Sequence, residues 1–425
     1  MTAGADSFRT VRRPRPAESH PTPQKDSHPM TLDFTSEAHA LADDLRALRR
    51  DLHREPEIGL DLPKTQRRIL DALEGLPLEI TLGQELSSII AVLRGAHPGP
   101  TVLLRGDMDA LPVEEATGLD FASTNKNMHA CGHDLHVSGL IGAAKLLSAH
   151  QSELKGTVAF MFQPGEEGMG GAKIMLEEGM FDTIGQKPAA AYAIHVAPGV
   201  PGTFVTKPGT IMAGANTLHV TMHGSGGHSS RPEDAVDPVR PILELGQALQ
   251  SMVTGSFSVF DPIVAQVTQL EAGEAVNVIP ASAKLGASVR TLSHESTRRF
   301  PERATQLAES IAAAHGCTAE VVWTEQYPVT VNDGTEADFA LRVLADRFGA
   351  ERAVQVPDPL MGSEDFSFVL EQVPGAFMFF FVTPEGIDPE SAATNHSPEV
   401  QFDDAHLPDQ AAALATLAWE RSLRG

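Results

Sequence analysis

The chain has 425 residues, of which 42% are hydrophobic and 21% are charged, so it has enough apolar material for two or three domains with ordinary cores. Its formal net charge of -24 at pH 7 would repel nucleic acid and anionic membranes, so neither is expected as a partner. The two cysteines, Cys131 and Cys317, exclude a disulfide framework. Because the sequence has neither an apolar run long enough for a membrane span nor a signal-peptide pattern, we expect a cytoplasmic protein.

The first thirty residues differ in composition from the rest. Residues 1–30 are rich in Pro, Ser, Thr and Arg, so we expect a disordered tail. Arginines such as Arg12 and Arg13 would suit a targeting peptide, but the prolines oppose the amphipathic helix that such a peptide forms. A dispensable tail is the simpler interpretation, and a third alternative is that translation starts at Met30.

Helix and strand signals alternate along residues 31–212. We expect a first helix at about 36–54, with Ser36 as its N-cap, because four leucines form one apolar stripe along it. The following apolar runs predict strands at 88–93 and 101–104 around a turn at 97–100, a helix at 135–147, and strands at 157–162 and 191–196. This alternation favours an α/β layered domain.

The pattern changes at about residue 213. Leu218, Val220 and Met222 alternate with polar residues, which is typical of a strand with one solvated face. The predicted elements are a strand at 217–223, a helix at about 236–253, strands at 263–270 and 283–292, a helix at about 302–315, and a strand at 319–323. This β-α-β-β-α-β order is that of the ferredoxin-like motif. We therefore predict a small domain at 213–324, inserted between residues 31–212 and 325–425 of the α/β domain, whose last elements are a strand at 377–382 and a helix at about 409–423.

Several side chains suited to metal ions follow the predicted strands. Asp107 and Asp109 come directly after the strand at 101–104, at the sheet edge where α/β proteins bind ligands. An aspartate at a strand end is alone more often a turn former or a helix cap. The segment His129–His136 holds three histidines and Cys131. Imidazole and thiolate are ligands that suit zinc and its neighbours, whereas a helix cap would need Ser, Asp or Asn.

Further candidates follow later strands. Glu166 and Glu167 come after the strand at 157–162, and one carboxylate of such a pair can bind metal while the other acts as general base. His195 ends the strand at 191–196, and His396 lies near the C-terminus; either histidine alone is more often a core residue. Because three of these segments end strands of one domain, we expect them at one edge of one sheet. Together they would suffice for two metal ions that activate one water.

Six segments in this order resemble the M20 family of metallopeptidases and amidohydrolases, specifically its aminoacylase, hippurate hydrolase and indole-acetyl-amino-acid hydrolase branch. They are Asp107–Pro112, His129–Asp134, Pro164–Gly168, Gly226–Ser230, Asn277–Pro280 and Gly362–Phe366. The resemblance covers about residue 38 to the end. It implies a mixed-sheet α/β catalytic domain and an inserted ferredoxin-like lid through which subunits pair as a homodimer, with a tetramer as an alternative.

The same resemblance implies the roles of individual residues. It implies two divalent metal ions per subunit, with Zn, Mn, Co and Ni as alternatives that spacing cannot separate. The implied ligands are Cys131, His133, Glu167, His195 and His396, with Cys131 bridging the two ions. It further implies that Glu166 is the general base and that Asp109 orients a ligand. Asp107 occupies the position of a metal-binding histidine in the wider family, as in its Cys-containing branch.

Three residues of the inserted domain are implied to contact the substrate. His228 would donate to the substrate carbonyl or its oxyanion from the partner subunit; the alternative is a surface histidine in a glycine-rich turn. Asn277 and Arg290 would bind the substrate carboxylate, for which a planar guanidinium is well suited, although a surface arginine is equally ordinary on this strand. Cys317 has no ligand neighbours, and we interpret it as a core or surface thiol.

The expected reaction is the hydrolysis of an N-acyl or N-aroyl amino acid to a carboxylate and a free amino acid. One alternative keeps this chemistry but takes a dipeptide, or an N-succinyl- or N-acetyl-diaminopimelate type of substrate. A non-catalytic metal-binding protein is an alternative from a different class, but it would require the base or the ligands to be lost, and all are present. A structural zinc site is disfavoured because such sites are usually closed sets of four Cys or His.

Overall fold

The computed structural model describes residues 32–424, and the tail predicted at residues 1–30 lies outside this range. Its largest sheet has eight strands in the order β1-β2-β4-β3-β5-β16-β6-β15. The strands are β1 (Leu78–Leu82), β2 (Ile89–Arg94), β3 (His97–Asp107), β4 (Lys155–Gln163), β5 (Ala190–Ala197), β6 (Phe204–Thr206), β15 (Ala353–Gln355) and β16 (Gly375–Phe381). Parallel pairs such as β3–β4 and β3–β5 stand beside antiparallel pairs such as β1–β2 and β2–β4. The sheet is therefore mixed, which confirms the predicted fold class.

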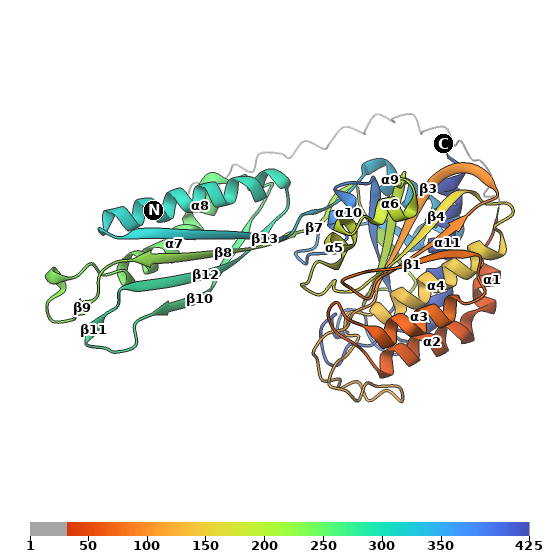
Figure 1. The fold of residues 1–425 in the computed structure, drawn as a ribbon, viewed down its shortest axis with the longest axis horizontal. Coiled ribbons are helices and arrows are strands. Elements are labelled where there is room, and N and C mark those ends of the chain that lie inside the picture. The colour runs from red at the N-terminus through yellow and green to blue at the C-terminus, as the bar shows by residue number, and fades with distance from the viewer. Residues whose placement is uncertain (1–31, 425) are drawn as a thin grey trace, which may run out of the picture. The chain divides into compact units, whose positions relative to one another are not determined.

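Helices cover both faces of this sheet (Figure 1). The helices of this part of the chain are α1 (Thr35–Ala40), α2 (Ala42–Arg54), α3 (Pro63–Leu73), α4 (His133–Ala149), α5 (Gly171–Glu177), α6 (Met180–Ile184), α9 (Gly334–Phe348), α10 (Ser367–Leu370) and α11 (Leu407–Ser422). Helices α4 and α11 pack together on β3, whereas α5 and α6 contact β4 and β2. Leu103 belongs to the core cluster that includes residues of α5 and α6, and its neighbours Val102 and Leu104, also fully buried, point to the other face. Burial on both faces explains why these strands are almost continuously apolar.

The strand ends that carry the candidate residues are adjacent in space. β4, β3 and β5 are consecutive in the sheet and parallel, with Asp107 opposite Gln163 and Arg105 opposite Ala193. Their carboxyl ends therefore meet at one edge of the sheet, as the sequence predicts.

The predicted ferredoxin-like order is also confirmed. A four-stranded antiparallel sheet has the order β10-β12-β8-β13. Its elements in chain order are β8 (Gly214–His223), α7 (Val239–Ser256), β10 (Val264–Ala272), β12 (Ser282–Thr291), α8 (His294–Ala314) and β13 (Thr318–Tyr327). Leu218, Val220 and Met222 are buried in one core with residues of α7 and α8, while His219 and His223 on the opposite face are exposed.

Two short pairings complete the inserted part. β7 (Gly209–Met212) precedes β8 and pairs with β14 (Thr330–Asn332), which follows β13. β9 (Gly227–His228) pairs with β11 (Val278–Ile279). Contacts within the described chain do not divide it at 213 or 324, so these predicted domain boundaries stay a prediction.

Two predictions about the first helix are wrong. The predicted helix is interrupted at Leu41, which separates α1 from α2. Ser36 is not the N-cap, because the helix already begins at Thr35 and the carboxylate of Asp33 accepts the N–H of Thr35 at 2.9 Å. The carboxylate of Asp33, which is also paired with Arg347, thus accepts an N–H of the first turn in place of the serine hydroxyl.

Two other predicted boundaries differ from the structure. The turn predicted at 97–100 belongs to β3, which begins at His97; the register with β4 shifts between His97 and Thr101 instead. Helix α8 begins eight residues before the predicted start at 302, because Ser293 caps it by accepting the N–H of Ser296 at 3.0 Å. Pro301 lies inside this helix, where it lacks the N–H that would donate to the carbonyl four residues earlier.

No helix within residues 32–424 is long and apolar enough to cross a lipid bilayer. Elements that the sequence patterns missed altogether include α3, α9, the edge strands β1 and β15, and β6 beside β15. The three strands have only three to five residues each, where a period of two residues is hardest to recognise.

Candidate active site

A glycine turn at the start of α4 carries the first candidate ligands. Gly132 has φ of 82° and is followed directly by His133, the first residue of the helix. A Cβ atom at Gly132 would lie 2.3 Å from Cγ2 of Val196, so both the backbone conformation and the space require glycine. Cys131 and His133 are therefore held on the two sides of a turn that packs against β5.

Two histidines each have one ring nitrogen left for a metal ion. Nδ1 of His133 lies 2.8 Å from the carbonyl oxygen of Asp109, and Nδ1 of His195 lies 2.8 Å from that of Val196. A carbonyl only accepts hydrogen bonds, so Nδ1 carries the proton in both rings, and in the neutral ring Nε2 carries a lone pair. Nε2 of His133 is buried without a hydrogen bond, and Nε2 of His195 lies 3.4 Å from Sγ of Cys131. This donor set fits a divalent cation.

Asp109 organises the two glutamates through their main chain. Its carboxylate oxygens accept the N–H groups of Glu166 and Glu167, both at 3.0 Å. Its carbonyl oxygen at the same time receives Nδ1 of His133. Asp109 is almost fully buried, so one residue fixes the position of a histidine and of both glutamates.

His396 reaches the same place from the C-terminal part of the chain. Its φ of 72° is in the left-handed region, which is uncommon for a residue other than glycine. The N–H of His396 donates to the carbonyl of Ala130 at 2.9 Å, and its Nε2 lies 3.2 Å from Oε1 of Glu167. Strained backbone held by its surroundings is typical of functional sites.

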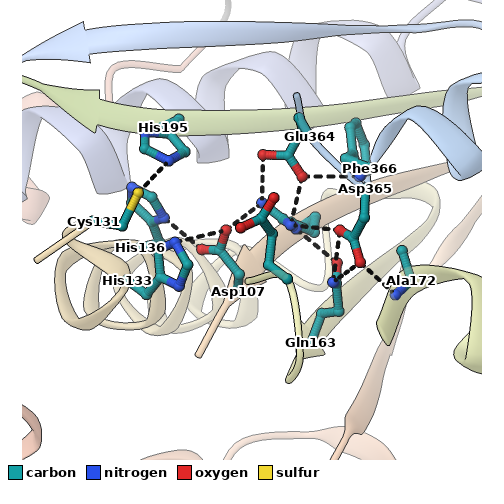
Figure 2. Close-up of polar contacts among 12 residues, drawn as sticks. Asp107, Cys131, His133, His136, Gln163, Ala172, His195, Glu364, Asp365 and Phe366 are labelled. Atoms are coloured by element: carbon teal, nitrogen blue, oxygen red, sulfur yellow. Dashed lines mark hydrogen bonds and ion pairs between the residues drawn. The ribbon is translucent and has the colours of Figure 1, made fainter. Parts of the chain in front are cut away.

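The five predicted metal ligands form two groups that share one member. In each group the potential ligand atoms all lie within 4.8 Å of one another. The first group is Cys131, His133 and His195, and the second is Cys131, Glu167 and His396. Figure 2 shows Cys131 beside His195, with His133 and His136 below them. The thiol of Cys131 is the atom common to both groups, as a bridging ligand would be.

His136 has a different role from its two neighbours. Its Nδ1 lies in hydrogen-bond contact with Asp107, and its Nε2 accepts the N–H of Val196 at 2.8 Å. Because both ring nitrogens are occupied, His136 supports the site rather than offering a ligand atom. Burial is the largest influence on His136 and His195, and it lowers the pKa of both rings, which favours neutral imidazole.

A buried charge network that the sequence patterns did not reveal lies next to these groups. The guanidinium of Arg105 is 3% exposed and donates to Asp107 at 2.6 Å, Glu364 at 2.8 Å and Asp365 at 3.1 Å. Figure 2 shows Glu364, Asp365 and Gln163 on the side of Asp107 away from Cys131. Arginine at the end of an apolar strand, together with the acidic pair in the segment Gly362–Phe366, was the available signal.

Charge and burial in this network act against each other. Burial raises the pKa of Glu364 to about 8 and that of Asp365 to about 6, while Arg105 opposes both shifts. Burial also raises the pKa of Glu166 well above its usual range, and the charges of Glu364 and Glu167 add to this shift. Bound cations would oppose the shift at Glu166, because nearby positive charge favours a carboxylate.

A cavity of about 590 Å³ opens beside the two ligand groups. Its wall includes Cys131, Glu166 and Glu167 and, from the inserted part of the chain, Arg290 and Tyr327. Arg290 is half-buried, and no ion pair within residues 32–424 joins it to a carboxylate. Burial lowers the pKa of this guanidinium. A cation in the wall without an acidic partner is a suitable receptor for an anionic ligand.

The other two residues predicted to bind substrate do not line this cavity. His228 in β9 pairs with Val278 in β11, and the carbonyl of Asn277 accepts the N–H of Ser229 at 3.1 Å. Both His228 and Asn277 are exposed. The structure therefore brings Arg290 to the cavity of its own chain, but not His228 or Asn277. Cys317 is buried in the core of the inserted part, as expected of a structural thiol.

Comparison with known proteins identifies the family. Residues 103–420 match Peptidase family M20/M25/M40. The chain is 37% identical to N-acetylcysteine deacetylase of Bacillus subtilis, over 78% of this chain and 86% of the relative. It is 35% identical to an IAA-amino acid hydrolase of Arabidopsis thaliana, over 87% of this chain and 85% of the relative.

A solved structure gives the same answer. A dinuclear metal-binding peptidase of the M20 family from Bacillus subtilis superposes with a TM-score of 0.78 at 33% identity, covering 91% of this chain and 99% of that one. The resemblance stated from the six sequence segments is thereby confirmed. The chain belongs to Peptidase family M20/M25/M40 and is a hydrolase of amide bonds.

Proposed function

We propose that this protein hydrolyses the amide bond of N-acyl or N-aroyl amino acids, releasing a carboxylate and a free amino acid. The observation that supports this most is the pair of ligand groups sharing Cys131, which lines one cavity together with Glu166 and Arg290. N-acetylcysteine and IAA-amino acid conjugates, which give two relatives their names, are both amides of an amino acid. Such substrates offer Arg290 a carboxylate.

The residues divide the work as follows. Cys131, His133, Glu167, His195 and His396 would hold two divalent ions per subunit, with Cys131 shared between them. When bound, the ions would polarise the scissile carbonyl and lower the pKa of a water molecule, which becomes a strong nucleophile once its proton is removed. The carboxylate of Glu166 takes the proton of that water and passes it to the leaving nitrogen. Asp109 keeps Glu166 in place through its main chain, and Arg290 binds the carboxylate of the substrate.

The inserted residues 213–324 are proposed to act as a separate domain that pairs two subunits. Since His228 and Asn277 do not line the cavity of their own chain, we propose that they complete the cavity of the partner subunit. There His228 would donate to the carbonyl oxygen as negative charge develops on it, and Asn277 would contact the substrate.

The proposed function is tested with a substrate panel. The metal-loaded protein is incubated with hippurate, N-acetyl-amino acids, indole-acetyl-amino acids and dipeptides, each in the presence of Mn, Co, Ni or Zn. Release of amino acid that a chelator abolishes is the expected result. Cleavage of dipeptides alone would move the function to the peptidase alternative, and bound metal without any turnover would contradict the proposed substrate class.

Glu166→Gln removes the proposed base but keeps a side chain of the same size. Turnover should fall by about 10²–10⁴-fold, the usual contribution of a positioned acid or base, while metal content measured by mass spectrometry persists. Glu385→Gln, at an exposed position outside the cavity, is the control and should keep full activity. Unchanged turnover in Glu166→Gln would show that another group takes the proton.

Cys131→Ala removes the atom common to both ligand groups. Because each proposed ion loses a ligand, metal content should fall below that of the wild-type protein, and activity should fall with it. Cys317→Ala removes the other thiol, which lies in the inserted core, and should leave metal content unchanged. Equal metal content in both variants would exclude a bridging role for Cys131.

A complementation experiment tests the role of His228 across a dimer. His228→Ala and Glu166→Gln homodimers should each be nearly inactive. A mixed dimer retains one complete site, in which the Glu166 of one chain meets the His228 of the other. Co-expression of the two variants should therefore restore about a quarter of the wild-type rate for random pairing in a two-fold dimer. If the co-expressed protein were no more active than the separate variants, His228 would not act between subunits.

A further inference from the structure

A short loop at the edge of the cavity is held rigidly by main-chain hydrogen bonds. The N–H of Leu360 donates to the carbonyl of Ile211 at 2.8 Å. The N–H of Ala213 lies 3.0 Å from the carbonyl of Leu360 and 2.9 Å from that of Gly362. The position of this loop therefore does not depend on the side chains of Leu360 and Met361.

Those two side chains are unusually exposed for their type. Leu360 is 50% and Met361 is 39% exposed, and both line the cavity. Met212 lines the cavity too, and its terminal methyl lies 3.0 Å from the place where a Cβ of Gly362 would be. Met212, Leu360 and Met361, here called the apolar wall, thus form one surface. Large apolar side chains on a rigid support, open to a ligand cavity, are typical of a specificity pocket.

A polar receptor adjoins this wall. Nη1 of Arg290 donates to Oγ of Ser363 at 3.0 Å, and both residues line the cavity. Because the serine oxygen accepts this bond, its own O–H remains free to donate. Arg290 and Ser363 therefore offer a carboxylate a guanidinium donor and a hydroxyl donor. Ser363 lies two residues after Met361 in the chain, so these donors adjoin the apolar wall.

We propose that the apolar wall selects the side chain of the leaving amino acid, and that Ser363 joins Arg290 in binding its α-carboxylate. This inference rests on the proposed function. The α-carbon of an amino acid lies one bond of about 1.5 Å from the carboxylate carbon, so a carboxylate held at Arg290 and Ser363 places the side chain beside the wall. A carboxylate side chain against this wall would lose hydration without gaining a hydrogen bond there. The favoured amino acids are therefore leucine, methionine and phenylalanine rather than glycine or aspartate.

The first test compares substrates that share one acyl group. N-benzoyl derivatives of leucine, methionine, glycine and aspartate are ranked by kcat/KM. The leucine substrate should exceed the glycine substrate by about 10-fold to 100-fold, the range that apolar contacts in a pocket provide. In Leu360→Ser/Met361→Ser this ratio should fall about tenfold or more. Ile387→Ser changes an exposed side chain outside the cavity and should keep the wild-type ratio. An equal loss for both substrates in the double variant would overturn the inference.

A binding experiment separates this inference from the proposed function. N-methanesulfonyl-leucine and N-methanesulfonyl-glycine lack the amide bond, and their affinity for the metal-loaded protein is measured by calorimetry. Tighter binding of the leucine compound that is lost in the double variant supports the proposed role of the apolar wall. This holds even if no N-acyl amino acid is hydrolysed and the proposed function fails. Equal affinity for the two compounds overturns the proposed role of the apolar wall even if N-acyl amino acids are hydrolysed.

The same measurement tests Ser363. Ser363→Ala should weaken binding of N-methanesulfonyl-leucine roughly tenfold, as expected for the loss of a hydrogen bond to a charged group, and Ser363→Thr should restore it. The corresponding leucinamide lacks the carboxylate, so its affinity should respond far less. Equal weakening of the acid and the amide by Ser363→Ala would show that Ser363 does not bind the carboxylate.

Discussion

The site depends on one buried cation. Arg105 brings together the carboxylate of Asp107 and those of the adjacent residues Glu364 and Asp365. The adjacent pair lies more than 250 residues further along the sequence. None of these charges would be tolerated in a low-dielectric interior without its partners, and removing one member would leave the others uncompensated. The effect extends further, because Asp107 holds His136, and His136 accepts the N–H of Val196 next to His195. The guanidinium thus links the ends of β3 and β5 to the segment before α10.

The candidate metal ligands are oriented from the same edge by main-chain groups. The carbonyls of Asp109 and Val196 each fix the tautomer of one histidine, so the lone pairs face the thiol of Cys131 before any ion arrives. The phenol of Tyr327, the last residue of β13, donates to the carbonyl of Glu166 and accepts the N–H of Gly170 at 3.1 Å. The loop that carries both glutamates is therefore tied to the sheet edge on one side and to the inserted strands on the other. Such prior ordering reduces the reorganisation that binding and reaction require.

The sequence predicts correctly those elements whose pattern depends only on residues that are close together in the chain. The apolar runs of β3, β4 and β5 and the alternation of Leu218, Val220 and Met222 depend on neighbours in sequence, and the elements they predict exist. Arg105 could not be interpreted in this way, because an arginine at a strand end has the same local signature whether it is solvated or paired with Glu364 in a distant segment. Helix α8 shows the limit at closer range, since the Ser293 cap and the core contact of Phe300 extend it eight residues before the predicted start, with Pro301 inside it. The spatial neighbours of His228 could not be predicted from local patterns for a further reason, because the cavity proposed for it belongs to the partner subunit.

In the proposed function, the chemistry and the recognition of the substrate are carried by different kinds of structure. The thiol, the histidines and the glutamates stand on the buried edge of the main sheet, where any change disturbs charged or close-packed neighbours. Arg290, Leu360 and Met361 instead come from an inserted strand and a surface loop whose main-chain bonds do not depend on side-chain identity. If the proposed roles hold, substitution at these positions changes which amino acid is accepted while leaving the sheet edge intact. This separation gives a physical reason why relatives with different named substrates can share the family's reaction.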